Sequence, residues 1–122
     1  MMLDRKNLHK YQEYSVSFIK NHNEAAVLLD CGLGKTAISL TAINDLMFDE
    51  FEVRKVLVIC PLRVCYVWRD EVTKWEHLKH LKLSIATGSV TERINALKAK
   101  ADIYVINREN VEWLFDKSGL RF

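Results

Sequence analysis

A short run in the first third of the chain combines residue types that bind phosphate groups. In order, its residues are Asp30, Cys31, Gly32, Leu33, Gly34, Lys35 and Thr36. Glycine lets backbone amides approach a triphosphate closely, because it carries no side chain. Lys35 would reach the β- and γ-phosphates as a point charge, and the Thr36 hydroxyl would bind Mg²⁺. The run therefore predicts a phosphate loop for a nucleoside triphosphate with magnesium.

The run departs in one place from the usual phosphate-loop pattern. Leu29 stands where that pattern has its first glycine, five residues before Gly34. The context nevertheless fits, because an apolar run precedes the loop and a helical pattern follows it. The helix dipole would add to the attraction for an anion. The alternative interpretation is a structural glycine turn followed by an exposed lysine.

The hydrophobic pattern alternates between strand-like runs and helical spacing. Strands are predicted at 25–29, 56–60, 82–87 and 102–106. Helices are predicted at about 8–22, at 36–51 with Phe51 on its apolar face, over 65–75, after Ser89 through Leu97, and from 111–115. Ser89 and Glu92 have the spacing of a capping box at a helix start. Alternation of this kind predicts an α/β fold with a mostly parallel sheet covered on both faces.

Composition is that of an ordinary soluble domain. The 122 residues suffice for a single domain, and the net charge of +2 does not by itself indicate nucleic acid. The three cysteines give no disulfide framework, and the start of the chain lacks the apolar core of a signal peptide. The apolar runs are too short to span a bilayer. We expect a cytoplasmic protein with no membrane association, in the host cell if a phage encodes it.

Four segments, taken in order, resemble a known family. The loop from Asp30 to Thr36 is similar to that of superfamily-two helicases, most closely the Swi/Snf-type translocases and their small phage versions, which tolerate a residue such as Leu29. The segment 8–12 resembles their adenine-recognition motif, whose glutamine is here Gln12. The segments 58–62 and 101–107 resemble motifs that line the nucleic-acid path. The resemblance covers residues from about 8 to 115.

The resemblance implies a three-layer RecA-like P-loop NTPase fold, with residues 1–122 forming a single N-terminal ATP-binding lobe. ATP and magnesium would be the cofactors, and nucleic acid, in particular double-stranded DNA, the partner of a full-length motor with a second RecA-like lobe. Candidate nucleic-acid contacts are Pro61, Leu62, Arg63 and Asn107.

The family's Asp-Glu motif (Walker B), which closes a strand and positions Mg²⁺, has no match. Asp49-Glu50 falls at the end of the phosphate-loop helix, and Asp70-Glu71 falls inside a later helix. The lobe is thus expected to be incomplete at its C-terminal side, to bind nucleotide weakly and not to hydrolyse it alone.

Other interpretations stay open. The chain could belong to another phosphate-loop enzyme, such as a small nucleotide or metabolite kinase, or be a non-catalytic module that binds nucleotide or DNA. Gln12 could simply occupy the wet side of an amphipathic helix. The spacing of Cys60, Cys65, His77 and His80 fits core cysteines and surface histidines better than zinc.

Overall fold

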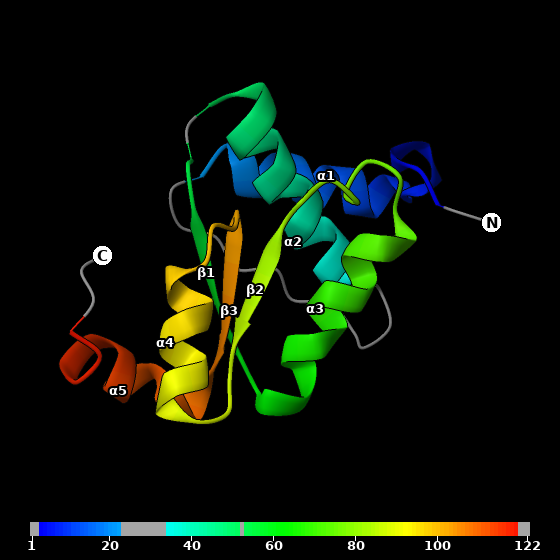
Figure 1. The fold of residues 1–122 in the computed structure, drawn as a ribbon. Coiled ribbons are helices and arrows are strands. Elements are labelled where there is room, and N and C mark those ends of the chain that lie inside the picture. The colour runs from blue at the N-terminus through cyan, green and yellow to red at the C-terminus, as the bar shows by residue number, and fades with distance from the viewer. Residues whose placement is uncertain (1–2, 23–33, 52, 120–122) are drawn as a thin grey trace. The chain divides into compact units, whose positions relative to one another are not determined.

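The computed structural model describes residues 3–22, 34–51 and 53–119. Figure 1 shows helices up to residue 51 and strands alternating with helices from residue 56 onward. The strands are β1 (Val56–Cys60), β2 (Leu83–Ala86) and β3 (Ile103–Asn107). The helices are η1 (Arg5–Asn7), α1 (Lys10–Lys20), α2 (Lys35–Asn44), η2 (Asp45–Asp49), α3 (Leu62–Lys74), α4 (Val90–Lys98), η3 (Arg108–Asn110) and α5 (Val111–Asp116). The predicted strand at 25–29 lies outside the described residues.

The chain divides into two compact units. The first consists of Met1–Arg54 with Asp70–His80, and the second of Lys55–Arg69 with Leu81–Phe122. The first unit contains η1, α1, α2, η2 and the end of α3, and the second contains the sheet, the start of α3, α4, η3 and α5. Among the helices described, none is both long and apolar enough to cross a lipid bilayer.

The second unit is built on a parallel sheet in the order β1-β3-β2. β3 is the middle strand, with Ile103 opposite Val56 on one side and opposite Leu83 on the other. Every residue of β3 is buried, as expected for a parallel strand covered on both faces. The structure confirms the predicted strand at 56–60 and the predicted parallel sheet.

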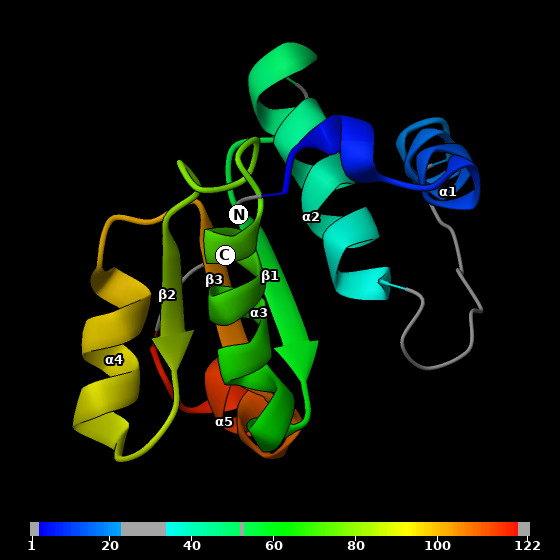
Figure 2. The ribbon, with the colours of Figure 1, turned by 90° about the vertical axis from the view of Figure 1, so that its right-hand side faces the viewer.

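Helices cover both faces of this sheet (Figure 2). α4 packs against β2, and Tyr66 and Arg69 of α3 lie on the other side of β2. The Ser89 hydroxyl accepts a hydrogen bond of 3.2 Å from the Glu92 amide and so caps α4, as the sequence predicts. The core on the α4 side consists of Ala86, Ile106 and Leu114, with Leu57, Ala96, Leu97 and Trp113 packed against it.

The first unit pairs two helices that carry the predicted site. α1 packs against α2 through Val16, Ile38 and Ala42, with Ile19 alongside. A parallel bridge between Leu3 and Trp75 joins the start of the chain to the end of α3. The predicted helices at 8–22 and 36–51 are therefore present, each somewhat shorter than predicted.

The end of the second helix corrects one prediction. After Asn44 the backbone widens into the π-helical turn η2, in which the Glu50 amide bonds to the Asp45 carbonyl at 2.9 Å. Met47 inside this turn is still buried, but the extra residue rotates the chain that follows it away from the face predicted from a regular 3.6-residue period. Phe51 leaves the helix with φ 55° and is 81% exposed, and its predicted place on the apolar face is wrong.

Candidate functional site

The described part of the predicted phosphate loop is the start of α2. Gly34 occupies the N-cap position with φ 77°, a left-handed conformation that glycine adopts without strain. Its carbonyl accepts the first helical hydrogen bond, from the Ile38 amide at 3.0 Å. Lys35 is exposed and Thr36 is half-buried in the first turn. Asp30, Cys31, Gly32 and Leu33 lie outside the described residues.

Gln12 packs directly against this helix start. Its side chain is 5% exposed, so the alternative that places it on the wet side of its helix is wrong. The Oε1 atom accepts a hydrogen bond of 2.8 Å from the His9 amide, and a Cβ atom at position 34 would overlap the Nε2 atom. The φ angle thus favours glycine at position 34, and any larger residue there would also have to displace the Gln12 amide. The two motifs, distant in sequence, meet in the first unit.

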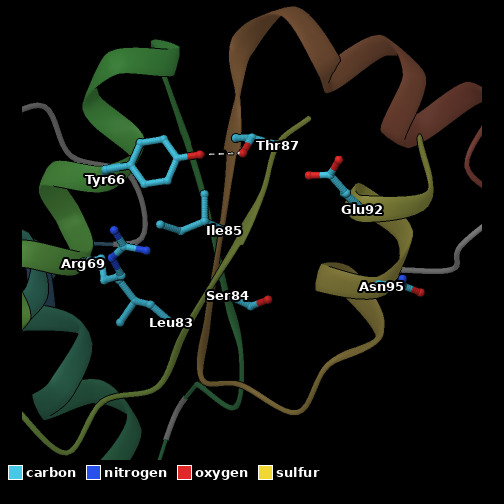
Figure 3. A pocket seen from close by; sticks show the side chains of 8 residues that line it. All are labelled: Tyr66, Arg69, Leu83, Ser84, Ile85, Thr87, Glu92 and Asn95. Atoms are coloured by element: carbon cyan, nitrogen blue, oxygen red, sulfur yellow. Dashed lines mark hydrogen bonds between the residues drawn. The ribbon is translucent and has the colours of Figure 1, made fainter. Parts of the chain in front are cut away.

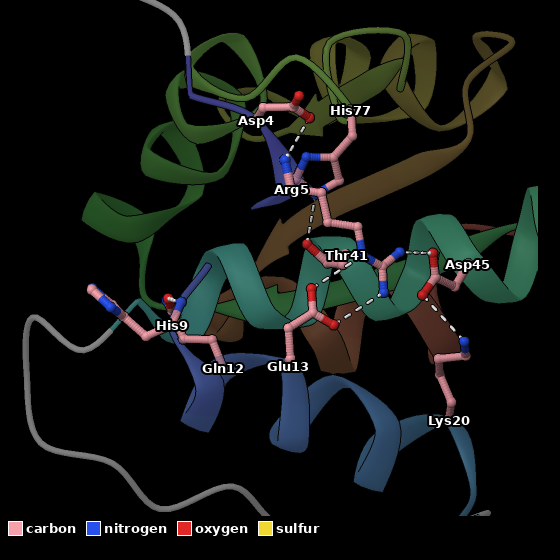
Figure 4. Close-up of polar contacts among 9 residues, drawn as sticks. All are labelled: Asp4, Arg5, His9, Gln12, Glu13, Lys20, Thr41, Asp45 and His77. Carbon is pink, nitrogen blue, oxygen red and sulfur yellow. Dashed lines mark hydrogen bonds and ion pairs between the residues drawn. The ribbon is translucent and has the colours of Figure 1, made fainter. Parts of the chain in front are cut away.

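A charged cluster ties the same two helices together (Figure 4). Asp45, at the end of α2, is 1% exposed and receives Arg5 Nη1 at 2.6 Å and Lys20 Nζ at 3.2 Å. The Arg5 Nε atom also bonds to Glu13 Oε1 at 3.2 Å. Lys20 further pairs with Glu50 at 3.1 Å. We call these residues, Arg5, Glu13, Lys20, Asp45 and Glu50, the Asp45 cluster.

Electrostatics within the cluster keep Asp45, Arg5 and Lys20 charged. Burial by itself raises the pKa of Asp45, but the hydrogen bonds from Arg5 and Lys20 outweigh it and leave the pKa below the ordinary value of 3.8. The hydrogen bond to Asp45 raises the pKa of Arg5, and salt-bridging to Glu50 and Asp45 outweighs burial at Lys20 and raises its pKa. Asp45 therefore carries a full negative charge at neutral pH.

A second buried contact joins α2 to the segment that follows α3. The Thr41 hydroxyl lies 2.9 Å from His77 Nε2, and Thr41 is fully buried. Burial, followed by the charge of Arg5, lowers the pKa of His77 below 6.5. His77 is thus neutral at pH 7 and is a packing residue with a partner, in contrast to the surface histidine that the sequence suggests.

The candidate nucleic-acid residues gather at one edge of the sheet in the second unit. Parallel pairing places Cys60 beside Asn107, so β1 and β3 end together. Pro61 follows β1 directly, and Leu62 and Arg63 open α3 with exposed side chains. Asn107 is buried at 6% exposure, donating to Glu109 at 2.7 Å and accepting from Asn110 at 2.6 Å. Its amide therefore organises the turn at this edge.

The cysteines of the second unit are core residues, as the sequence predicts. Cys60 and Cys65 are both buried, with their sulfur atoms 3.4 Å apart. Burial, together with the neighbouring Cys65 thiol, raises the pKa of Cys60 to about 12. Such a thiol is protonated at neutral pH and is a poor nucleophile. In the described ranges the structure brings no three His, Cys, Asp or Glu side chains together as metal ligands.

A pocket of about 530 Å³ lies in the second unit, on the outer side of β2. Figure 3 shows Tyr66 and Arg69 on one wall and Glu92 and Asn95 on the other, with the Tyr66 hydroxyl 3.0 Å from that of Thr87. Leu83, Ser84 and Ile85 complete the lining. It contains none of the predicted phosphate-binding residues, so we do not assign the nucleotide to it.

Neither Asp-Glu pair closes a strand, in agreement with the sequence. Asp49 ends the π turn, and Glu50 pairs with Lys20. Asp70 is exposed in the middle of α3, where Glu71 accepts a hydrogen bond of 3.0 Å from Trp75 Nε1. Glu50 and Glu71 therefore make structural contacts within the first unit.

Sequence reasoning missed the Asp45 cluster. Arg5 and Asp45 are separated by 40 residues, and neither belongs to a motif. A signal was available in the position of Asp45, which follows Thr41 and Ala42 by one helical turn on the face of α2 that also carries Ile38. A carboxylate on a buried face requires a cation as its partner.

Comparisons with known proteins agree with this architecture. The chain matches the SNF2-related domain family over residues 11–116. It is 36% identical over 111 residues to protein p41 of Acyrthosiphon pisum secondary endosymbiont phage 1, covering 89% of this chain and 24% of the phage protein. It is 29% identical over 120 residues to the ATP-dependent helicase MG018 of Mycoplasma genitalium, covering 91% of this chain and 11% of that helicase.

Among solved structures, the fold matches the Sulfolobus solfataricus SWI2/SNF2 ATPase core in complex with double-stranded DNA. The TM-score is 0.65 at 29% identity, over 83% of this chain and 21% of that one. The chain thus spans a quarter or less of the length of these relatives. Because the family match extends over most of the chain, from α1 through α5, the chain belongs to the SNF2-related domain family, whose members include helicase-like ATPases.

Proposed function

We propose that residues 1–122 are the N-terminal ATP-binding lobe of a DNA-dependent translocase ATPase. The observation that carries the proposal is the meeting of Gln12 with Gly34 at the start of α2. This contact brings the proposed adenine-binding residue to the proposed phosphate-binding helix start. A purely structural glycine turn would not need a glutamine beside it. A family relative that acts as a helicase, and another solved on double-stranded DNA, support the same assignment.

The described residues fit a magnesium nucleotide. Gly34 caps the helix start in a left-handed conformation beside the Gln12 amide, and Lys35 is an exposed cation in the first turn. In the proposed site Lys35 binds the β- and γ-phosphates, Thr36 supplies its hydroxyl to Mg²⁺, and Gln12 contacts the adenine. When bound, magnesium would neutralise charge on the phosphates. Asp30, Cys31, Gly32 and Leu33 would contribute the remaining loop amides.

By themselves, residues 1–122 are proposed to bind ATP weakly without steady hydrolysis. The Asp-Glu pairs that they contain lie in helices and hold structural contacts, as described above. In this proposal other residues supply two things: a carboxylate beside the nucleotide that activates water, and the groups of a second RecA-like lobe. Phosphate release at a steady rate from this chain with Mg-ATP would contradict this part of the proposal.

Double-stranded DNA is the proposed partner of the whole motor. Arg63 is an exposed cation directly after the strand end, at the edge where the carboxyl ends of β1 and β3 meet. A guanidinium at this position suits a backbone phosphate. Leu62 and Pro61 would shape the path beside it, and Asn107 would act through the turn that it organises. Such a motor would work in the cytoplasm.

The nucleotide assignment is tested by Lys35→Ala with labelled ATP. Loss of the ammonium group should weaken binding at least tenfold, because it removes a charge-assisted contact to the phosphates, each tenfold being about 1.4 kcal/mol. Lys98→Ala, which removes an exposed lysine at the end of α4 in the other unit, is the matched control and should leave the affinity unchanged. Equal binding by Lys35→Ala and the parent chain would refute the phosphate-loop assignment and favour the structural glycine turn.

A further inference from the structure

We propose that Asp45 and Arg5 are positioning residues that set the base selectivity of the nucleotide site. They would do so by fixing α1, which carries Gln12, in one register against α2, which carries Gly34 and Lys35. The inference rests on the proposed adenine contact of Gln12 and extends it to residues outside every motif described above.

Cations reach Asp45 from both ends of α1. Arg5 lies in η1, just before α1, and Lys20 is the last residue of α1. Both bond to the same carboxylate, one to each oxygen, at 2.6 and 3.2 Å. A carboxylate held in this way from both ends of a helix prevents that helix from sliding in either direction along its axis.

Arg5 also connects the buried carboxylate to the neighbour of Gln12. Its Nε and Nη2 atoms lie 3.2 and 3.4 Å from the carboxylate oxygens of Glu13. The planar guanidinium therefore bonds to α1 and to η2 in one fork. A displacement of Asp45 is transmitted through Arg5 to the residue next to the predicted adenine contact.

Apolar packing alone cannot provide this register. The α1–α2 contact is a small cluster of Val16, Ile38 and Ala42 with Ile19 beside it, and burial of such surface is non-directional. One residue of sliding moves a helix by about 1.5 Å along its axis. That distance is enough to take the Gln12 amide out of hydrogen-bond range of a base, while Lys35 stays with α2.

We expect the affinity for the phosphates and the affinity for the base to respond differently when the Arg5–Asp45 ion pair is lost. Contacts to the phosphates belong to α2 and should survive this loss. Contacts to the base belong to α1 and should weaken. A residue that merely stabilised the fold would instead lower the affinity for every ligand by the same factor.

The experiment measures binding of ATP, GTP and inorganic tripolyphosphate to Asp45→Asn, by competition against labelled ATP. We expect the preference for ATP over GTP to fall about tenfold, with the tripolyphosphate affinity within about twofold of the parent chain. Arg5→Gln, which leaves Lys20 on Asp45, is the milder second variant and should move the preference in the same direction. Glu76→Gln removes an exposed ion pair with Lys79 at 2.7 Å and is the matched control.

Variants of Gln12 distinguish the positioning role of Asp45 and Arg5 from the adenine contact of Gln12 itself. Gln12→Ala should abolish the preference, and adding Asp45→Asn to it should cause no further loss, because both act on the same contact. If Gln12→Ala lowers the preference while Asp45→Asn and Arg5→Gln retain it, the positioning role is refuted and the adenine contact stands. An equal loss for all three ligands in Asp45→Asn and Arg5→Gln also refutes it. If Gln12→Ala has no effect, the adenine contact falls together with this inference.

Discussion

Both compact units bury an apolar core, but they differ in what accompanies it. In the first unit an apolar cluster of Val16, Ile38 and Ala42 is joined by the buried carboxylate of Asp45 and its two cations. In the second unit the central strand β3 is buried over its whole length. The unit that carries the predicted nucleotide site thus adds directional electrostatic contacts to its apolar core, and the unit that carries the sheet adds the parallel pairing of a fully buried strand.

The difference bears on what each unit can do. Hydrogen-bonded ion pairs specify one relative position of two helices, which a site assembled from α1 and α2 requires. Apolar packing stabilises strongly but is non-directional, so it sets the relative position of two helices less sharply. In the sheet this is sufficient, because parallel pairing already fixes the register of the strands. The two units should therefore respond differently to core truncation and to acid.

The largest effect is expected from truncation in the sheet. Ile106→Ala should lower the free energy of unfolding by about 2–5 kcal/mol, because Ile106 is fully buried and its loss leaves a cavity. Chemical denaturation at pH 7 and at pH 5.5 measures the loss, which should be the same at both values. Ile59→Ala, on the same sheet with a side chain 47% exposed, is the control and should cost less than half as much. If Ile106→Ala lost more free energy of unfolding at pH 5.5 than at pH 7, the proposed difference between the two units would be contradicted.

The next effect is expected at the ion cluster. Asp45→Ala removes the carboxylate that Arg5 and Lys20 share and should cost about 2–3 kcal/mol. This is below the roughly 3–5 kcal/mol of a fully buried pair, because the Arg5 side chain is 36% exposed and both cations keep a second carboxylate, Glu13 or Glu50. Hydrogen exchange should place the loss of protection in α1 and α2. Glu76→Ala, in an exposed pair, should cost less than about 1 kcal/mol. If amides of β1 and β3 lost their protection from hydrogen exchange first, Asp45 would not act on the packing of α1 against α2.

The alternation of elements was predictable because it depends on local pattern. The apolar run at 56–60 and the Ser89–Glu92 spacing each specify their element within a few residues. The π turn was not predictable, because no residue type in 45–49 demands an extra residue in a helical turn. Its consequence, the outward position of Phe51, reverses a prediction made from regular helical spacing.

The site was predictable in its residue types and only partly in its contacts. Glycine, lysine and threonine at fixed offsets indicate a phosphate loop, and Gln12 follows from the resemblance. The burial of Gln12 against Gly34, and the tie from Arg5 to Asp45, depend on how α1 packs on α2. Packing between helices distant in sequence has no local signature, so these contacts required the structure.

A smaller effect is expected at the start of α4. Ser89→Ala removes the hydroxyl that accepts from the Glu92 amide and should cost about 1 kcal/mol. Ser89→Asp, which keeps an acceptor at the N-cap, is the matched control and should be neutral within about 0.5 kcal/mol. Thermal unfolding of the three chains side by side measures the difference. A large loss in both variants would mean that the residue acts through another contact.

The last effect is an acid sensitivity of the first unit at His77, which grows with the change in pH. Burial lowers the pKa of His77 from 6.5 in the folded chain, so below about pH 6.5 the unfolded chain binds a proton that the folded chain refuses. Stability should therefore fall as the pH drops from 6.5, by at most about 1.4 kcal/mol per pH unit for one group. The stability that Asp45 contributes is lost only in more acidic solution, because its pKa lies below 3.8. We therefore assign a loss of stability between pH 5 and 6.5 to His77. His77→Gln can still bond to the Thr41 hydroxyl and should flatten the stability profile in this range, whereas Lys79→Gln should not. An unchanged slope in His77→Gln would assign the acid sensitivity to another group and remove His77 from the electrostatic account of the first unit.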